Sequence, residues 1–520
     1  MIQDIQLRVN PATAYTPLRL TACVSTQLHI DANRIRDIKI LKRSIDARQR
    51  QVMVNLNVRI YIDEDAPAHP LFTPVEYKPI THDARQCVIV GAGPAGLFAA
   101  LRLIELGIRP IVLERGKDVD SRRKDMAGIA RNGIVNPDSN YCFGEGGAGA
   151  YSDGKLYTRS KKRGPVDKIL TIFHQHGAQE NILVDAHPHI GTDRLPEVIK
   201  SIRHTIVRCG GEVHFSTKVT SLILDDGKVT GATTADGQQF RGPVILATGH
   251  SARDIYTMLQ QLDIPLEAKG IAVGVRLEHP QHLIDSLRYH NPKGRGKYLP
   301  PAEYTMLTRV DDRAVYSFCM CPGGVIIPAA SAPGEMVVNG MSSSTRGSRW
   351  ANSGMVVEVL PEDIDGDSDD PLKMMRFQQS IEQAFFQESG QSQNAPAQRM
   401  TDFVASRMST SLPATSYAAG IHPARIDLLL PKGIARRLQR GFEEFGRKQR
   451  GFLTNEAVLI GDETRTSSPI RIPRDPETLR HVAIDGLYPC GEGAGYAGGI
   501  ASAAIDGERC ADAVAESLRP

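Results

Sequence analysis

The sequence predicts an α/β protein whose central sheet is parallel and covered by helices. Residues 87–90 have the pattern of a buried strand, and the glycine-rich turn 91–96 and a helix follow. Residues 111–113 form a second strand, which ends in Glu114. A further strand, a glycine cluster and a small-residue helix follow residue 481, near the other end of the chain. Strands and helices that alternate in this way build doubly wound parallel sheets of Rossmann type.

Length and composition limit the number of domains and the setting of the protein. A chain of 520 residues exceeds what one hydrophobic core usually sustains, so we expect two or three domains. The apolar runs are too short to cross a bilayer and the N-terminus lacks the pattern of a secretory signal, so we expect a cytoplasmic protein with no membrane partner. The eight cysteines have no CxxC spacing, so we expect reduced thiols and no metal site.

The turn at residues 91–96 has the spacing of a dinucleotide-binding fingerprint. Its first glycine allows a tight turn, the second lets the backbone approach a pyrophosphate, and the third lets the helix pack on the strand. The helix N-terminus adds free N–H groups and the positive end of a dipole. Glu114, 18 residues beyond the third glycine, suits a ribose hydroxyl and disfavours the 2′-phosphate of NADP. NAD or FAD is therefore predicted to bind Gly91, Gly93, Pro94, Ala95, Gly96, Glu114 and Arg115.

The C-terminal glycine cluster favours FAD over NAD. FAD is long enough to need a second place of close backbone approach, and residues 491–500 lie between a strand and a helix. Glu492 would bind ribityl hydroxyls or, through water, the pyrophosphate. The helix that begins near residue 499 would face the pyrimidine edge of the flavin, where negative charge develops on reduction. The contacts predicted here are Gly491, Glu492, Gly498, Gly499 and Ile500.

Three further segments agree with an FAD site. Thr248 and Gly249 follow a strand and resemble the turn that returns the chain to the dinucleotide domain, and Val219 lies in a strand that would pair with adenine. Gly146 and Gly147 belong to the loop 144–155, which would bring backbone amides to the flavin ring. A flexible connector is the alternative for this loop, because glycine content alone does not distinguish the two.

These assignments divide the chain into three domains, one of them discontinuous. Residues 1–80 form a small, basic α+β N-terminal domain of ferredoxin-like type. Residues 83–158, 205–255 and 478–520 build the Rossmann-type FAD-binding domain, with a helical insert at 159–204. Residues 256–477 form a mixed α+β substrate or cap domain, in which the acidic stretch 362–370 is a solvated loop.

Taken together, these residues resemble a family of bacterial FAD-dependent dehydrogenases, uncharacterised NAD(P)/FAD-dependent oxidoreductases with a small N-terminal domain ahead of a glutathione-reductase-type FAD domain. The resemblance extends over nearly the whole chain. More distantly, the chain is similar to geranylgeranyl-reductase-like flavoproteins. The resemblance implies bound FAD and redox chemistry but no particular substrate. It rests on residues 42–48, 143–155, 189–193, 247–254, 318–324 and 463–469 and on the C-terminal glycine cluster.

Catalytic residues are less clearly marked. Lys155 closes the glycine-rich loop, Cys321 forms a CxC pair with Cys319, and Arg465, like Arg471, suits an anionic substrate. Buried thiols and structural ion pairs are the alternatives for these side chains. Because the chain has one complete fingerprint, we expect NAD(P)H to dock transiently against the flavin, or the substrate itself to reduce FAD.

Three histidines carry weaker signals. His250 follows the turn at residues 248–249 and is either near the dinucleotide or structural. His187 and His189 lack the spacing and the nearby carboxylates of a metal site.

The predicted function is an FAD-dependent oxidoreductase that moves a hydride between the flavin and a small or medium organic substrate. An FAD-binding redox sensor or partner-binding protein, and a flavin monooxygenase, are the alternatives. The N-terminal unit carries ten basic residues against four acidic ones before residue 60. No aromatic residues interleave these charges, so nucleic acid is not expected. A solvated face or a dock onto the FAD domain is expected instead, with a protein partner as the alternative.

Overall fold

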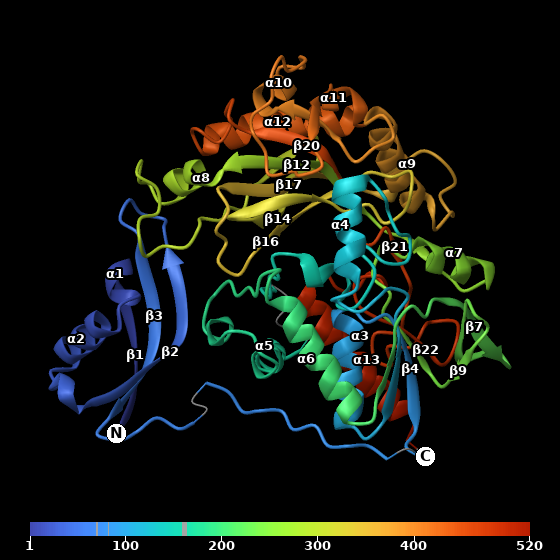
Figure 1. The fold of residues 1–520 in the computed structure, drawn as a ribbon, viewed down its shortest axis with the longest axis horizontal. Helices are drawn as coiled ribbons and strands as arrows, with labels where there is room; N and C mark the ends of the chain where they lie inside the picture. Colours follow the sequence, from blue (N-terminus) through green and yellow to red (C-terminus); the bar gives the residue numbers. More distant parts are fainter. Residues whose placement is uncertain (69–70, 82, 159–163, 520) are drawn as a thin grey trace.

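The computed structural model describes residues 1–68, 71–81, 83–158 and 164–519 and consists of three parts. The N-terminal unit lies to the side, the Rossmann-type domain lies below, and a large, mostly antiparallel sheet lies above it (Figure 1). The predicted start of the helical insert, residue 159, lies outside the described residues. No helix in the described ranges is long and apolar enough to cross a membrane.

The N-terminal unit is one antiparallel sheet with helices on one face. Its strands β1 (Ile2–Val9), β2 (Ile35–Asp46) and β3 (Met53–Ile62) lie in the order β1-β3-β2. Helices α1 (Pro11–Ala14) and α2 (Pro17–Leu28) connect β1 to β2 in the sequence. Alternate residues of β3 are buried and share a core with α2. The ferredoxin-like part of the prediction is wrong, because that fold needs a fourth strand and a second crossing helix, which the described part of this unit lacks.

The second part is the Rossmann-type domain that the sequence predicts. Five parallel strands lie in the order β22-β10-β4-β5-β6, and helices α3 (Pro94–Glu105) and α13 (Ile500–Ser517) pack against one another beside them (Figure 1). Residues 87–90 are all buried, as expected for a parallel strand covered on both faces. The strands are β4 (Gln86–Val90), β5 (Arg109–Leu113), β6 (Glu212–His214), β10 (Val244–Leu246) and β22 (Leu487–Pro489).

Smaller elements complete this domain. A three-stranded antiparallel sheet consists of β7 (Val219–Asp225), β8 (Lys228–Thr234) and β9 (Gln239–Arg241). The further helices of the Rossmann-type domain are α4 (Arg122–Asn132), α5 (Val166–Gln175), α6 (Leu195–Arg208) and α7 (Arg253–Gln261). A short 3-10 helix covers Gly147–Tyr151. The parallel strand β22 comes from near the end of the chain and pairs with β10, so the C-terminal glycine cluster begins at the same sheet edge as the first glycine-rich turn.

The third part is a cap built on a seven-stranded sheet. Its strand order is β13-β14-β17-β12-β20-β18-β19, and α12 (Lys432–Lys448) lies on the face away from the Rossmann-type domain (Figure 1). The strands are β12 (Ile271–Pro280), β13 (Leu307–Val310), β14 (Arg313–Cys321), β17 (Trp350–Val359), β18 (Ala395–Arg399), β19 (Ile421–Pro423) and β20 (Val458–Glu463). Two pairs, β11 (Glu267–Ala268) with β21 (Ile470–Arg471) and β15 (Gly324–Pro328) with β16 (Val338–Ser342), and helices α8 (Gln281–Arg288), α9 (Lys373–Glu388), α10 (Met400–Val404) and α11 (Ile426–Leu429) complete it.

The basic N-terminal unit docks onto both other parts through the end of β2. Arg43 forms a two-point ion pair with Asp185, at 2.6 and 3.1 Å, and its backbone pairs with residues 184 and 186. Nε2 of His290 in the cap lies 2.9 Å from the carbonyl oxygen of Ala47. Part of the positive charge of the unit therefore serves docking.

Replacing Asp185 with alanine is expected to loosen the N-terminal unit. The ion pair is mostly shielded from water and has two-point geometry, so its loss should destabilise the docked state by about 1–2 kcal/mol. Limited proteolysis of the linker at residues 63–81 should become faster. Asp4→Ala breaks the Arg59–Asp4 pair inside the unit and is the control, so equal cleavage rates in the two variants would contradict the docking role.

Candidate functional site

A cavity of about 360 Å³ lies where the carboxyl ends of the parallel strands meet the cap. We call it the glycine-lined cavity. Its walls come from the turn after β4, the loop 142–155, the turn after β10 and the start of α13. Phe318, Cys319 and Asn339 close it from the cap. Ligands of open parallel sheets bind at this edge, so the location alone marks a site.

The first glycine-rich turn supplies both packing and an open cradle. Gly91 has φ +106°, and a Cβ there would lie 2.5 Å from the carbonyl oxygen of Ala247. A Cβ at Gly96 would lie 1.9 Å from the carbonyl oxygen of Gly91, so this glycine lets α3 approach the strand. Gly93 is different, because a Cβ there meets nothing within 4 Å and would project from the cavity wall. The chain thus leaves open the place where a pyrophosphate would approach α3.

Glu114 is fixed at the end of β5. Its carboxylate accepts hydrogen bonds from the backbone N–H groups of Ala92 (2.8 Å), Gly116 (2.9 Å) and Gly144 (3.0 Å). A carboxylate has about four lone-pair positions, so it retains capacity for a hydroxyl donor from the cavity. Arg115 beside it is held by Asp254, at 2.8 Å to both oxygens.

The C-terminal glycine cluster lies against the first glycine-rich turn. A Cβ on Gly491 would lie 2.9 Å from the Cβ of Ala95, and one on Gly149 would lie 3.1 Å from the side chain of Ile500. Gly498 and Gly499 have open space beside them and line the cavity ahead of α13. Segments more than 390 residues apart thus form one site, as the FAD hypothesis requires.

Two described residues of the cavity lining each carry a buried polar atom without a hydrogen-bond partner. Within the described ranges, Nη1 of Arg465 and Nδ1 of His250 have no hydrogen-bond partner. Burial lowers the pKa of His250 to about 3, so its imidazole is neutral. Its Nε2 lies 3.5 Å from Glu492.

Glu492 is expected to lower the stability of the folded apoprotein as the pH rises. Burial, followed by the nearby Cys319, raises its pKa to about 7. Between about pH 4.5 and 7 the folded state holds a proton that the unfolded state has lost, so stability falls over that window and stays lower above it. Glu492→Gln should therefore gain stability over wild type as the pH rises from 4.5 to 7.5, by up to about 3 kcal/mol, measured by thermal unfolding of the apoproteins. A pH-independent difference would contradict this.

Most of the predicted site residues line the cavity. Gly96, Gly146 and Gly491 do not, because they pack behind its wall: a Cβ at Gly146 would lie 2.4 Å from Ile199 of α6. Arg471 is exposed on β21 and lies over the ring of Tyr496, at 5.7 Å. The predicted residues that line it are Gly91, Gly93, Pro94, Ala95, Glu114, Arg115, Gly147, Lys155, Val219, Thr248, Gly249, Glu492, Gly498, Gly499, Ile500 and Arg465.

The candidate catalytic residues divide in an unexpected way. Cys319 lines the cavity, whereas the predicted Cys321 is fully buried behind it. Lys155 donates a hydrogen bond to the carbonyl oxygen of Met320, between the two cysteines. Asn339 of β16 also lines the cavity and was missed, because a lone polar residue in a strand carries no motif.

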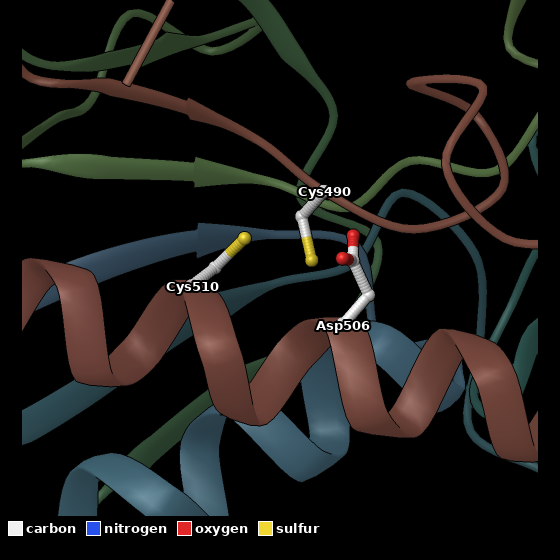
Figure 2. A group of neighbouring side chains, drawn as sticks. All are labelled: Cys490, Asp506 and Cys510. Atoms are coloured by element: carbon white, nitrogen blue, oxygen red, sulfur yellow. The ribbon is translucent and has the colours of Figure 1, made fainter. Parts of the chain in front are cut away.

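A second group of thiols lies beneath the C-terminal glycine cluster. Figure 2 shows Cys490 and Cys510 beside Asp506, close enough together to hold a metal ion. The guanidinium of Arg474 already binds the atoms that a metal ion would need, because it donates to Asp506 at 2.6 and 2.9 Å and to the Cys510 sulfur at 3.4 Å. We therefore assign these residues to the packing of α13 under the glycine turn.

The residues of the glycine-lined cavity fit FAD. The open position at Gly93 suits a pyrophosphate, Glu114 suits a ribose, and the unpartnered nitrogens of His250 and Arg465 suit polar edges of a ring. Residues 84–241 match a family model described as an FAD binding domain, which supports the same cofactor. FAD is thus the cofactor of this protein.

Known proteins match all three parts of the chain. Residues 270–466 match the family model "FAD-dependent protein, C-terminal domain-like", and residues 1–61 match a domain of unknown function. A protein of Clostridium beijerinckii described as uncharacterized is 40% identical over 512 residues, which cover 95% of both chains.

Solved structures are much more distant. A geranylgeranyl bacteriochlorophyll reductase-like protein of Thermoplasma acidophilum is 13% identical with a TM-score of 0.34, over 84% of this chain and 79% of the other. The glycerol-3-phosphate dehydrogenase of Bacillus halodurans, solved with FAD, is 13% identical with a TM-score of 0.37, over 84% and 66%. Only the full-length relative and the family models therefore bear on identity: the chain belongs to the same family as the Clostridium protein, and it carries an FAD binding domain and the C-terminal domain of FAD-dependent proteins.

Proposed function

We propose that this FAD-dependent oxidoreductase is a dehydrogenase that moves a hydride between the bound flavin and an organic anion, with NAD(P)H as a transiently docked electron donor. The observation that carries the proposal is a second cavity beside the glycine-lined one. It has a volume of about 1340 Å³ and lies between the N-terminal unit, the segment 181–189 and the cap. We call it the interdomain cavity.

The interdomain cavity has an excess of positive charge. Several of its cations are held by carboxylates, as in the Arg43–Asp185 pair, but the lining keeps three more cationic than anionic side chains, histidines aside. A surplus of this sign attracts anionic substrates. The cations are Arg43, Arg48, Arg288, Arg346, Lys448 and Arg450, and the anions are Asp46, Asp185 and Glu303.

Contacting pairs of side chains, one from each lining, lie between the two cavities. Tyr157 lines the glycine-lined cavity, and its ring centroid lies 4.9 Å from that of His187 in the interdomain cavity. Arg346 lines the interdomain cavity and donates at 2.6 and 3.1 Å to Asp153, which lines the other. The linings of the two cavities are therefore in contact, and a substrate in the larger cavity would reach the flavin past these side chains.

Four groups at the wall of the glycine-lined cavity suit hydride transfer to or from a negatively charged molecule. When bound, FAD supplies the hydride chemistry. Lys155 and Arg465 would orient anionic groups, since both carry positive charge at the cavity wall. The N-terminus of α13 stabilises negative charge where that helix meets the cavity. His250 stays neutral and holds a proton on one ring nitrogen.

Anaerobic reduction of the yellow holoprotein tests this function. NADH, NADPH and a panel of organic carboxylates and phosphates are added separately, and the loss of flavin absorbance is followed. At least one donor should bleach the flavin with a saturable rate, and an organic acceptor should restore the colour. If dithionite bleaches the flavin but no biological donor does, the redox-sensor alternative replaces the proposal. Rapid reoxidation only by oxygen would indicate a monooxygenase.

Arg450→Gln is expected to weaken the binding of the substrate without slowing hydride transfer. Arg450 is exposed and lines the interdomain cavity, so its loss should raise the KM of the organic anion about 3- to 10-fold and leave kcat unchanged. Arg447→Gln is the matched control, because Arg447 is 74% exposed and does not line that cavity. Equal KM values in the two variants would contradict entry through the interdomain cavity.

A further inference from the structure

We propose that Cys319 and Cys321 are a redox-active dithiol that exchanges two electrons with the bound flavin. The proposal needs the FAD site but not the substrate or the donor proposed above, and it can fail independently of them. It assigns a second redox centre to the cap, on the strand that closes the glycine-lined cavity. Three features of this strand support it: the shape of its backbone, the access of Cys319 to the cavity and the positive charge beside the thiols. A comparison with another cysteine pair of the molecule supports it as well.

The backbone around the two cysteines is irregular. Between Phe318 and Cys321, three steps along β14 oppose two along β17, so the strand contains a bulge. Cys319 has φ +45°, a left-handed conformation that is unusual outside glycine. Residues i and i+2 of a regular strand are about 6.6 Å apart, near the upper limit of about 6.8 Å for a disulfide, and a bulge shortens that distance. The strained turn thus favours contact between the two sulfurs.

The two thiols differ in access. Cys319 lines the glycine-lined cavity at the cap end, whereas Cys321 is fully buried behind it. The Cys321 thiol donates to the carbonyl oxygen of Cys319 at 3.4 Å. This arrangement provides one sulfur that faces the cofactor site and one that is shielded and can close the disulfide.

Two cations are held against the same turn. The fully buried Arg276 donates to the carbonyl oxygen of Cys319 at 2.9 Å and to the Cys321 sulfur at 3.4 Å, and Lys155 donates to the carbonyl oxygen of Met320. The Cys321 hydrogen bond, with Lys155 and Arg276, holds the pKa of Cys319 well below its usual range. These effects outweigh burial and the carboxylates that face Cys319, which are Asp153, Glu463 and Glu492.

Cys490 and Cys510 show what an inert pair looks like in the same molecule. They are also adjacent and buried, but neither lines the glycine-lined cavity. Donation of the Cys490 S–H toward the Cys510 sulfur, followed by burial, raises the pKa of Cys490 well above its usual range. Contact between two thiols alone therefore does not make a redox centre, and it is access and positive charge that distinguish Cys319 and Cys321.

The exchange balances within the protein. With Cys319 as the thiolate, forming the disulfide breaks the S–H bond of Cys321 and makes one S–S bond, which releases two electrons and one proton. The flavin accepts both electrons and this proton. The reverse step returns two electrons from reduced flavin to the disulfide. The dithiol can thus store one electron pair between two half-reactions of the flavin.

Reductive titration of the air-oxidised holoprotein under argon tests the proposal. With dithionite, the wild type should take up four electrons for each FAD, two for the flavin and two for the disulfide. Cys319→Ser and Cys321→Ser should each take up two, and Cys23→Ser, in the N-terminal unit, should behave like wild type. Mass spectrometry of the peptide with residues 319–321 should show two hydrogens fewer before reduction than after it. Uptake of two electrons by wild type with an intact dithiol would overturn the proposal.

Alkylation of the apoprotein provides a readout that needs no flavin. Cys319 should react with iodoacetamide at a pH below about 7, where an ordinary thiol is protonated. Lys155→Met should shift this reactivity to higher pH, whereas Lys117→Met, which removes a lysine that does not line the glycine-lined cavity, should not. A profile for Cys319 that matches an ordinary thiol and ignores Lys155 would contradict the thiolate and with it the proposal.

Discussion

Replacing Gly93 with valine should give a folded protein that no longer retains FAD. Gly93 is the residue before α3, with φ −76° and ψ −176°, an extended conformation that valine also adopts. Its added side chain meets no atom within 4 Å of the Cβ position and would fill the cavity where the pyrophosphate approaches the helix. We expect FAD affinity to fall about 100-fold or more, while the protein keeps its circular dichroism spectrum.

Two other glycines show whether this loss is specific. Gly96→Ala places a Cβ 1.9 Å from the carbonyl oxygen of Gly91, so it should lower stability together with FAD binding. Gly128→Ala in α4 meets no atom closer than 3.9 Å and should change neither. Bound FAD per chain, from absorbance after gel filtration, gives the result. Retention of FAD by Gly93→Val at the wild-type level, or unfolding of that variant, would contradict the assignment of Gly93 to the pyrophosphate site.

The FAD side of the site was predictable because its residues are set by local backbone requirements. A tight turn between a parallel strand and a helix needs glycine at residues 91 and 96, and β4, α3 and β5 lie where that pattern predicts them. The return of the chain at residues 487–500 was predictable for the same reason, since close backbone approach again requires glycine. These signals are short-range, so one sequence contains them.

The cap side was not predictable, because its contacts join residues far apart in sequence. Lys155 and Met320 meet across 165 residues, and Arg276 reaches Glu463 across 187. Neither pair leaves a spacing that could be recognised. The bulge that places Cys319 at the cavity and Cys321 behind it depends on pairing with β17. Gly146 packs on α6, although other residues of its loop line the cavity. Tertiary context decides each of these.

The two halves of the site therefore have different physical characters. Open glycines dominate the Rossmann-type side, where the backbone itself would contact the cofactor. Buried charge dominates the cap side, where Arg276 with Glu463 and Arg465 with Glu382 hold the wall of the cavity. Burying a charge is costly unless it is paired, so these networks also determine how stable the cap is.

Glu382→Gln is expected to cause the largest loss of stability. Glu382 in α9 is fully buried and accepts hydrogen bonds from Arg253 (2.8 Å), from Arg465 (2.7 and 2.8 Å) and from Thr464 (2.7 Å). Without its charge, the half-buried Arg253 and the buried Arg465 keep Glu335 as their one carboxylate partner among the described residues. Breaking such a network lowers the free energy of unfolding by about 3–5 kcal/mol. Arg465 should also lose its position at the glycine-lined cavity, so FAD should bind more weakly.

The pH dependence identifies the cause of this loss. Burial opposes the charge of Glu382, but Arg253 and Arg465 outweigh it and lower its pKa to about 2. Its stabilisation is therefore complete above about pH 4.5 and disappears as the pH falls through 2, so the difference in urea midpoint between wild type and Glu382→Gln should shrink over that range. Glu443→Gln, which breaks the exposed pair with Arg447, should leave the midpoint unchanged at every pH. A deficit of Glu382→Gln that stays constant down to low pH would mean that lost packing, and not lost charge, destabilises the cap.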